Sequence, residues 1–469
     1  MQKEVNTKKY EVEKLLSLNG FKVESIEERT KDNKQILEVS VKSIKNKARC
    51  PYCSNFSNIV FEHNKPQKLL YLRAAEKETY LIVHKRRFKC KKCNKTFTED
   101  LGLSDKKGRI SLKVKQKILR DLLDKDKTIR VIAKENNVKD DCVREIFIEA
   151  TKGIPKRVEY LPEVISFDEN STYTNEGTFS FILNDPIHQI TLDILKSREK
   201  DYLVDYFLKV KNRKNVKVVI IDLYKPYKSV AKICFPNAII VGDPFHYTKI
   251  VTQELNNLRN RLIKKYENNK KSLEYKTLKS RRNAGLLLKT FGETRGEQKK
   301  KKQIVQQILE GKTKKKIKGK FNDYWFGEIK IMRNNKYVMV TRISELNRML
   351  SLDKELLDSY NLKEEFMRIV NNVKYEDIRK NLIKWIKQCK DSNIPEMISA
   401  SETIENWLDE IVNSFIDERY SNGFTEANNK IIDRIVANGY GYKNFEFFRL
   451  RALVILRKSY SIGTRKNLK

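Results

Sequence analysis

Between residues 160 and 245, the spacing of apolar positions alternates between the period of a strand and that of a helix. Continuous or alternating apolar runs predict strands, and apolar positions three or four residues apart predict helices. The expected strands cover residues 164–168, 178–183, 189–195, 216–223 and 238–241. A helix is expected over residues 200–210, and Pro226 begins another.

Three successive strands followed by alternating helices and strands is the order of an RNase H-like fold. In that fold the first and fourth strands lie side by side at the centre of the sheet. The first expected strand ends at Asp168 and the fourth at Asp222, so we expect these carboxylates to meet across adjacent strands. Glu169, Asp185 and Asp193 have no second supporting feature, and we interpret them as solvated or capping residues.

A third carboxylate would have to come from a helix packed on this sheet. Glu426 fits this role, because it opens a helical segment in which Asn429 and Asp433 share its face. Carboxylates gathered in this way bind Mg²⁺ or Mn²⁺, and two such ions activate water and stabilise a leaving 3′ oxygen. The pattern therefore predicts a phosphodiester site at Asp168, Asp222 and Glu426.

An Asp-x-x-His pair, Asp243 and His246, follows the fifth expected strand. This pair could be accessory to the site, by holding a flipped base or positioning the scissile phosphate. It could equally form a structural hydrogen bond that closes the turn from strand to helix.

Two Cys-x-x-Cys pairs lie in the first hundred residues. Four thiolates in this spacing favour a structural Zn²⁺ site of the zinc-ribbon type over two unrelated pairs. The strand-like run 79–84 between the pairs indicates a ribbon with a β-insert, and Arg86 and Arg87 are candidates for contacts to phosphate. The expected zinc ligands are Cys50, Cys53, Cys90 and Cys93.

Residues 111–150 predict a short helical domain. Asn137 suits a left-handed turn, and Lys139 to Arg144 would begin the recognition helix of a helix-turn-helix. An ordinary helical hairpin explains the same pattern about as often. The neighbouring cysteine pairs and the positive charge favour DNA contacts at Lys139 and Arg144.

A long helical and highly charged segment separates the fifth strand from Glu426. Its run at 299–320 holds ten Lys and one Glu, and is either a solvated loop or a clamp for flanking or target DNA. The tryptophans of this segment are expected in its core rather than as wedges between bases. They are Trp325, Trp385 and Trp407.

The net charge of the chain indicates which class of molecule it binds. The chain has 98 Lys and Arg against 61 Asp and Glu, which gives a formal charge of +37. A surplus this large favours a nucleic acid over a merely solvated basic surface. No apolar run of about eighteen residues occurs, and the first residues lack the core of a signal peptide, so we expect no membrane partner and a cytosolic location.

Together these patterns predict a multidomain α/β protein. The expected parts are a zinc-ribbon DNA-binding domain at 1–105, a helix-turn-helix domain at 106–157, the first part of an RNase H-like core at 158–250, a helical insertion at 251–420, and the C-terminal part of the core at 421–469.

Several motifs resemble those of DDE transposases of the ISL3 group of bacterial insertion sequences, and the resemblance covers nearly the whole chain. These motifs are Cys50-Pro-Tyr-Cys53, Arg86-Arg-Phe-Lys-Cys-Lys-Lys-Cys93, Lys95-Thr-Phe97, Asp168-Glu169, Ile221-Asp-Leu-Tyr-Lys-Pro-Tyr227, Phe235-Pro-Asn-Ala238, Asp243-Pro-Phe-His246, Asn422-Gly-Phe-Thr-Glu-Ala-Asn-Asn-Lys430 and Gly439-Tyr-Gly-Tyr442.

The resemblance implies that Asp168, Asp222 and Glu426 are the metal-binding triad and that the N-terminal modules bind the terminal inverted repeats of the element. It implies a transposase that cleaves DNA, joins the 3′-OH to target DNA, and works as a homodimer or larger synaptic assembly at the bacterial nucleoid. Two alternatives remain open: a nuclease of similar fold without joining activity, and a transposase-derived DNA-binding protein without catalysis.

Overall fold

A computed structural model of the chain describes residues 11–31, 34–105, 108–174, 177–294, 303, 307, 328–333, 336–439, 442 and 444–464. Apart from residues 303 and 307, the Lys-rich run at 299–320 lies outside the described residues, as does Trp325. The chain divides into two compact units. Unit 1 contains residues 1–156, 171–178 and 430–469, and unit 2 contains residues 157–170 and 179–429.

Unit 1 begins with a four-stranded sheet of order β1-β2-β7-β6. Alternating positions on its strands bury a small core of their own, which includes Val39, Val41, Leu81 and Val83. The strand predicted at 79–84, between the two cysteine pairs, is confirmed as β7; it pairs in parallel with β2 and antiparallel with β6, in a sheet separate from the strands beside the cysteines. The bounds are β1 Phe21–Lys31, β2 Lys34–Ser43, β6 Gln67–Leu70 and β7 Glu78–His84.

The cysteine pairs lie on short strands that form two further small sheets, one of order β5-β8-β9 and one of β3 with β4. Phe88 and Phe97 stack beside the cysteines and form most of the apolar contact in this region. The bounds are β3 Ala48–Arg49, β4 Phe56–Ser57, β5 Val60–His63, β8 Arg86–Lys89 and β9 Thr96–Thr98.

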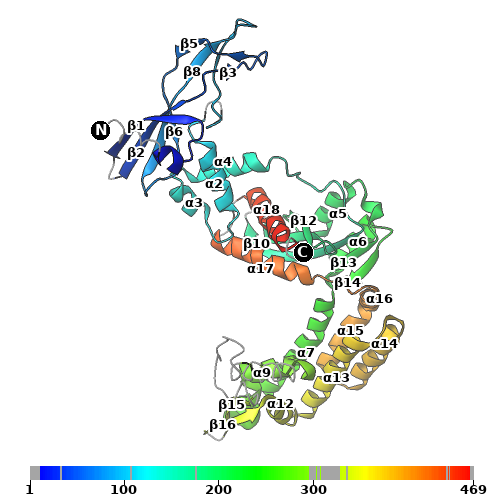
Figure 1. Cartoon of the computed structure of the whole chain (residues 1–469). Helices are drawn as coiled ribbons and strands as arrows, with labels where there is room; N and C mark the ends of the chain where they lie inside the picture. The colour runs from blue at the N-terminus through cyan, green and yellow to red at the C-terminus, as the bar shows by residue number, and fades with distance from the viewer. Residues whose placement is uncertain are drawn as a thin grey trace. The chain divides into compact units, whose positions relative to one another are not determined.

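Three helices follow in unit 1: α2 Leu112–Leu122, α3 Ile129–Glu135 and α4 Asp140–Thr151 (Figure 1). Ser111 and Thr128 accept hydrogen bonds from backbone N–H groups in the first turns of α2 and α3, which fixes where these helices start. Asn137 has a φ of 53°, as predicted for the left-handed turn between α3 and α4.

The last helix, α18 Phe445–Thr464, belongs to the same unit. Its buried Arg451 donates hydrogen bonds to backbone carbonyls in the segment between α2 and α3. The acceptors are the carbonyl oxygens of Leu122, Asp124 and Lys127.

Unit 2 is built around a five-stranded sheet of order β12-β11-β10-β13-β14 (Figure 1). The strands and helices expected between residues 160 and 245 are confirmed in type and order. They are β10 Val164–Thr174, β11 Gly177–Asp185, β12 Ile190–Leu195, α5 Lys200–Leu208, β13 Val218–Ile221, α6 Lys225–Cys234 and β14 Ile239–Gly242. A short helix that was not predicted, η1 Arg213–Asn215, lies between α5 and β13.

A cluster of aromatic rings joins the sheet to α5 and α6. Phe167 of β10 packs against Phe181 of β11, Phe207 of α5 and Tyr227 of α6, with ring centroids 5.0–5.9 Å apart. These contacts bury Phe167 completely and fix the part of β10 that carries Asp168.

The expected helical insertion is present among the described residues of unit 2, together with a two-stranded hairpin. Trp385 and Trp407 are buried in its core, as predicted. Its elements are α7 Pro244–Lys265, η2 Glu267–Asn269, α8 Leu273–Lys279, α9 Arg281–Leu288, β15 Glu328–Arg333, β16 Lys336–Thr341, α12 Arg342–Leu350, α13 Lys354–Asn372, α14 Tyr375–Asp391, α15 Pro395–Asn406 and α16 Leu408–Asn413; α17 Gly423–Asn438 follows. Among the described helices, none is long and apolar enough to cross a membrane.

Candidate active site

The two central strands of the unit 2 sheet bring Asp168 and Asp222 to one edge. β10 and β13 pair in parallel up to Ser166 and Ile220, so Asp168 and Asp222, two positions further along, both lie just beyond the paired stretch. β13 ends there, whereas β10 continues to Thr174 and so does not end at Asp168 as expected. Both carboxylates are buried, each with 8% of the residue surface exposed. The predicted meeting of Asp168 and Asp222 across adjacent strands is confirmed, at the edge where open α/β sheets bind ligands.

Asp168 is held by hydrogen bonds on both carboxylate oxygens. The backbone N–H of Glu169 donates to Oδ1 at 2.7 Å, and Asn429 Nδ2 donates to Oδ2 at 3.0 Å. Burial nevertheless raises the pKa of this carboxyl to about 6, and the neighbouring charges of Asp243 and Glu169 act in the same direction. A positive charge at this edge would therefore stabilise the ionised form.

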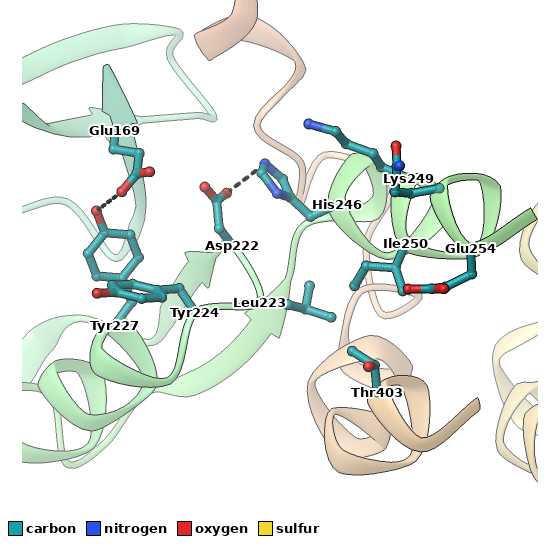
Figure 2. Close-up of a pocket in the computed structure, with 11 residues that line it drawn as sticks. Glu169, Asp222, Leu223, Tyr224, Tyr227, His246, Lys249, Ile250, Glu254 and Thr403 are labelled. Carbon is teal, nitrogen blue, oxygen red and sulfur yellow. Dashed lines mark hydrogen bonds and ion pairs between the residues drawn. The ribbon is translucent and has the colours of Figure 1, made fainter. Parts of the chain in front are cut away.

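Asp222 sits between Asp168 and the first turn of α7. His246 Nε2 lies 3.0 Å from Asp222 Oδ1 (Figure 2), and Asn422 Nδ2 lies 3.5 Å from the same oxygen. Burial raises the pKa of Asp222 well above its ordinary value, and the charges of Asp168 and Asp243 raise it further. Burial also lowers the pKa of His246, which favours the neutral imidazole.

Asp243 joins this group from the end of β14. One ligand atom from each of Asp222, Asp243 and His246 falls within 4.8 Å of the others. The backbone N–H of Asn422 donates to Asp243 Oδ1 at 2.9 Å, and burial raises the pKa of Asp243 to about 6. The Asp-x-x-His pair thus joins the acidic edge, because His246 lies closer to Asp222 than to Asp243, at 3.0 Å against 3.9 Å.

Glu426 lies in the first turn of α17 with its side chain exposed. Its charge is one of the causes that raise the pKa of Asp243. Asp222, Asp243 and His246 come together directly and Asp168 acts on Asp222 by its charge, whereas Glu426 is outside this cluster of close ligand atoms and acts on Asp243 by its charge.

Buried polar side chains attach the start of α17 to the sheet. Asn184 Nδ2 donates to Thr425 Oγ1 at 3.1 Å, and Asn428 Nδ2 donates to Thr191 Oγ1 at 3.0 Å. Sequence reasoning missed this role for Thr425 and Asn428. The spacing of Asn422, Thr425 and Asn428, three residues apart, would have placed them on one helical face.

Glu169 is neither solvated nor a cap, so that interpretation was wrong. Arg198 Nη1 donates to both of its carboxylate oxygens, at 2.6 and 2.7 Å, and the Tyr227 hydroxyl lies 3.3 Å from Oε2 (Figure 2). Asp193 is also not solvated, because it is fully buried and accepts a hydrogen bond from Tyr206. Asp185 does cap a turn, by accepting from the backbone N–H of His188.

A cavity of about 450 Å³ opens beside Asp222. Its walls come from the end of β10, the turn between β13 and α6, the first turns of α7, and α15. Figure 2 shows Tyr224 and Tyr227 on one side of Asp222, with His246 and Lys249 on the other.

In unit 1, the four predicted zinc ligands come together. Their sulfur atoms lie within 4.8 Å of one another, with Cys50 Sγ to Cys93 Sγ at 3.7 Å and Cys53 Sγ to Cys90 Sγ at 3.5 Å. Four sulfurs bound to one Zn²⁺ at about 2.3 Å would be separated by about 3.8 Å, so this cluster fits a structural zinc ion. The backbone N–H groups of Cys93 and Lys92 lower the pKa of the Cys90 thiol to about 6, which favours the thiolate.

The candidate DNA-contacting cations of unit 1 differ in their surroundings. Arg86 forms a two-point ion pair with the buried Glu99, through Nε and Nη2 at 2.9 and 2.7 Å. Arg87 lies partly exposed, with Thr96 accepting a hydrogen bond from its Nη2 at 3.0 Å. Lys139 is exposed just before α4, and Arg144 is half-exposed beside Asp141.

Comparison with known families identifies what the chain is similar to. The model of the ISL3 family of DDE transposases, described as a transposase, matches residues 165–452, which is more than half of the chain. A second model, described as the zinc-finger of transposase IS204/IS1001/IS1096/IS1165, matches residues 46–93. No curated protein matched the chain. The two family matches confirm the resemblance drawn from the motifs.

Proposed function

The chain belongs to the ISL3 family of DDE transposases, and we propose that it cleaves phosphodiester bonds at the ends of an insertion sequence and joins the freed 3′-OH to target DNA. The observation that carries this proposal is the meeting of Asp168 and Asp222, beside Asp243, just beyond the paired stretch of adjacent parallel strands. Burial makes ionised carboxylates costly there, and a divalent cation would offset that cost.

The strand order β12-β11-β10-β13-β14, with β10, β13 and β14 parallel, supports an RNase H-like core. Asp168, Asp222 and Glu426 would hold Mg²⁺ or Mn²⁺, in a site for two ions. Bound there, the ions would supply Lewis-acid activation of water and stabilise the leaving oxygen. Asn429 holds the carboxylate of Asp168 in a fixed orientation, and His246 does the same for Asp222.

We infer that the zinc ribbon and helices α2–α4 bind the terminal inverted repeats. The family match over the ribbon, the formal charge of +37 and the left-handed turn before α4 support a helix-turn-helix beside the ribbon. Arg87, Lys139 and Arg144 would contact the DNA backbone or bases. Arg86 would act mainly by stabilising the ribbon, because its guanidinium is committed to Glu99.

The triad can be tested with end-labelled DNA that carries the inverted repeat of the element. The assay measures how much of this DNA is cleaved and how much is joined to target DNA. We expect Mg²⁺-dependent cleavage and strand-transfer products with the unaltered protein, and loss of both in Asp168→Asn, Asp222→Asn and Glu426→Gln. Asp205→Asn, an exposed acid on α5, serves as the matched control. Full cleavage by any of the three variants would remove that residue from the triad.

Cleavage without joined products would instead identify a nuclease, and binding without cleavage would identify a non-catalytic DNA-binding protein. Because two element ends must react together, we expect a homodimer or larger assembly on DNA. Light scattering can test this expectation, because it gives the mass of the complex that the protein forms with two repeat ends.

A further inference from the structure

The boundary between the two compact units falls inside one helix. α17 is continuous from Gly423 to Asn438, yet residues 423–429 belong to unit 2 and residues 430–438 belong to unit 1. Glu426, the third candidate metal ligand, lies in the part that belongs to unit 2. The other end of the same helix therefore belongs to the unit that contains the zinc ribbon and helices α2–α4.

In unit 1, the end of α17 is attached to the segment between α2 and α3. Asn438 Nδ2 donates a hydrogen bond to the carbonyl oxygen of Lys125 at 3.1 Å, and Arg434 Nε lies 2.5 Å from Asp126 Oδ1. The buried Arg451 of α18 holds the same segment by donating to its backbone carbonyls. Helix α3 begins directly after this segment, so its position is tied to the end of α17.

In unit 2, the start of α17 is attached to the sheet that carries the candidate metal ligands. Asn429 donates to Asp168, and Thr425 and Asn428 form hydrogen bonds with buried polar side chains of β11 and β12. These contacts hold the turn that carries Glu426 against the sheet. The opposite end of the helix is left to make the contacts with the segment before α3.

A regular α-helix is a stiff connection between these two sets of contacts. Its backbone N–H groups bond to carbonyls four residues earlier, and it rises about 1.5 Å per residue, so the stretch from Glu426 to Asn438 spans about 18 Å. Helices bend sharply at Pro or at interior Gly residues. α17 contains no Pro, and its one Gly is at its first position, so its sequence favours a straight helix of fixed length.

We propose that α17 sets the position of the cut relative to the bound inverted repeat, with Arg434 and Asn438 as positioning residues. The inference rests on the proposed function, because it takes helices α2–α4 to read the repeat and Glu426 to act at the cut. Contacts with bases specify which sequence is bound. Which phosphodiester is cleaved depends in addition on how the reading helices are connected to the carboxylates, and α17 supplies that connection.

Mapping the cut to single nucleotides tests the role of the two side chains. The unaltered full chain should cut end-labelled repeat DNA at one phosphodiester. In Arg434→Asp, which places two carboxylates opposite each other, and in Asn438→Ala, cuts at neighbouring phosphodiesters should increase roughly 5- to 10-fold relative to the main cut. The affinity for repeat DNA should not change, because both side chains bond to groups of the protein.

Reversal of the ion pair separates positioning from a general loss of structure. Asp126→Arg together with Arg434→Asp recreates the pair with its charges exchanged, and it should restore the single cut. Arg379→Asp is the matched control, because it breaks a similarly exposed pair with Asp409 in unit 2, and it should leave the cut position unchanged.

The spacing of the DNA gives an independent test with the unaltered protein. One base pair is inserted between the repeat and the normal cut. The cut should stay at the same distance from the repeat, and therefore move to a different phosphodiester of the original sequence. A cut that follows the sequence instead of the distance would overturn the proposal.

Three other results bear on the proposal. A single unchanged cut in both Arg434→Asp and Asn438→Ala would overturn it, as would a reversed pair that fails to restore the cut position. Equal loss of cleavage at every position, with parallel loss of repeat binding, would also overturn it, because that result indicates a role in folding alone. None of these results affects the proposed function, which would fail only if the unaltered protein cut no repeat DNA.

Discussion

Replacing Asp168 with asparagine should stabilise the metal-free protein at pH 8, although it should abolish cleavage. Burial raises the pKa of the Asp168 carboxyl to about 6, from an ordinary value of 3.8. For an acid whose pKa is raised by folding, its contribution to stability is fully present below pH 3.8 and is lost as the pH rises through about 6. At pH 8 the ionised Asp168 therefore destabilises the fold, and a neutral amide would not.

The size of the effect follows from the change in pKa. A pKa of about 6 in place of 3.8 corresponds to about 3 kcal/mol of unfolding free energy. The hydrogen bonds can be kept, because the amide oxygen still accepts from the backbone N–H of Glu169. No described residue donates to Asn429 Oδ1, so turning that amide lets it accept from the new side chain. We therefore expect the change in hydrogen bonding to lower the unfolding free energy of the variant only slightly, compared with the increase from removing the buried charge.

Thermal unfolding in EDTA, followed by circular dichroism, measures this effect. At pH 8 the Asp168→Asn variant should unfold roughly 5 °C above the unaltered protein. The difference should shrink as the pH falls towards 4, and added Mg²⁺ should stabilise the unaltered protein more than the variant. The control Asp205→Asn should change little at either pH, because that carboxylate is exposed. A variant that unfolds at or below the unaltered protein at pH 8, or a difference independent of pH, would refute the reasoning.

Three further substitutions test other contacts. Cys90→Ser should release the zinc ion, seen as less than one Zn²⁺ per chain by metal analysis, whereas Cys389→Ala should retain it; retention in both would contradict the four-cysteine site. Arg451→Met should cost roughly 3–5 kcal/mol in urea unfolding, because several buried carbonyls lose their donor, and an unchanged midpoint would exclude this role. Thr425→Val should cost about 1–3 kcal/mol, because the buried Asn184 amide loses its acceptor, and equal stability would show that water replaces it.

The strands of the unit 2 sheet could be predicted because each carries its own signal. The run from Val218 to Ile221 is apolar on both faces, as a central parallel strand requires, and Asp222 marks its end. The parallel partner of a strand carries no such local signal. β7 was expected between the cysteine pairs, but its pairing with β2, about forty residues earlier in the chain, was not predicted. The alternation that buries Val39 and Val41 predicts a strand there, yet nothing in it specifies which neighbour it joins.

Side-chain partners were harder still to predict. Glu169 follows Asp168 directly, and a strand reverses its side-chain direction at each residue, so the two acids point to different surroundings. Only the fold brings Arg198 and Tyr227 to Glu169. The resulting cluster packs against the Tyr224 ring, a contact that no residue pattern in the sequence indicates.

The position of Glu426 depends on hydrogen bonds more than on apolar packing. Asp222 and Asp243 directly follow strands, and Asp168 lies within β10 just beyond its pairing with β13, so the register of one continuous sheet fixes their spacing, which tolerates small changes in the core. Glu426 comes from a helix whose first turns are attached through buried amides and hydroxyls, and its own side chain is exposed. Hydrogen bonds between buried polar groups are directional, and an unpaired group is costly, so this attachment permits few alternative positions. A substitution such as Thr425→Val should therefore impair metal-dependent cleavage more than its effect on stability alone would suggest.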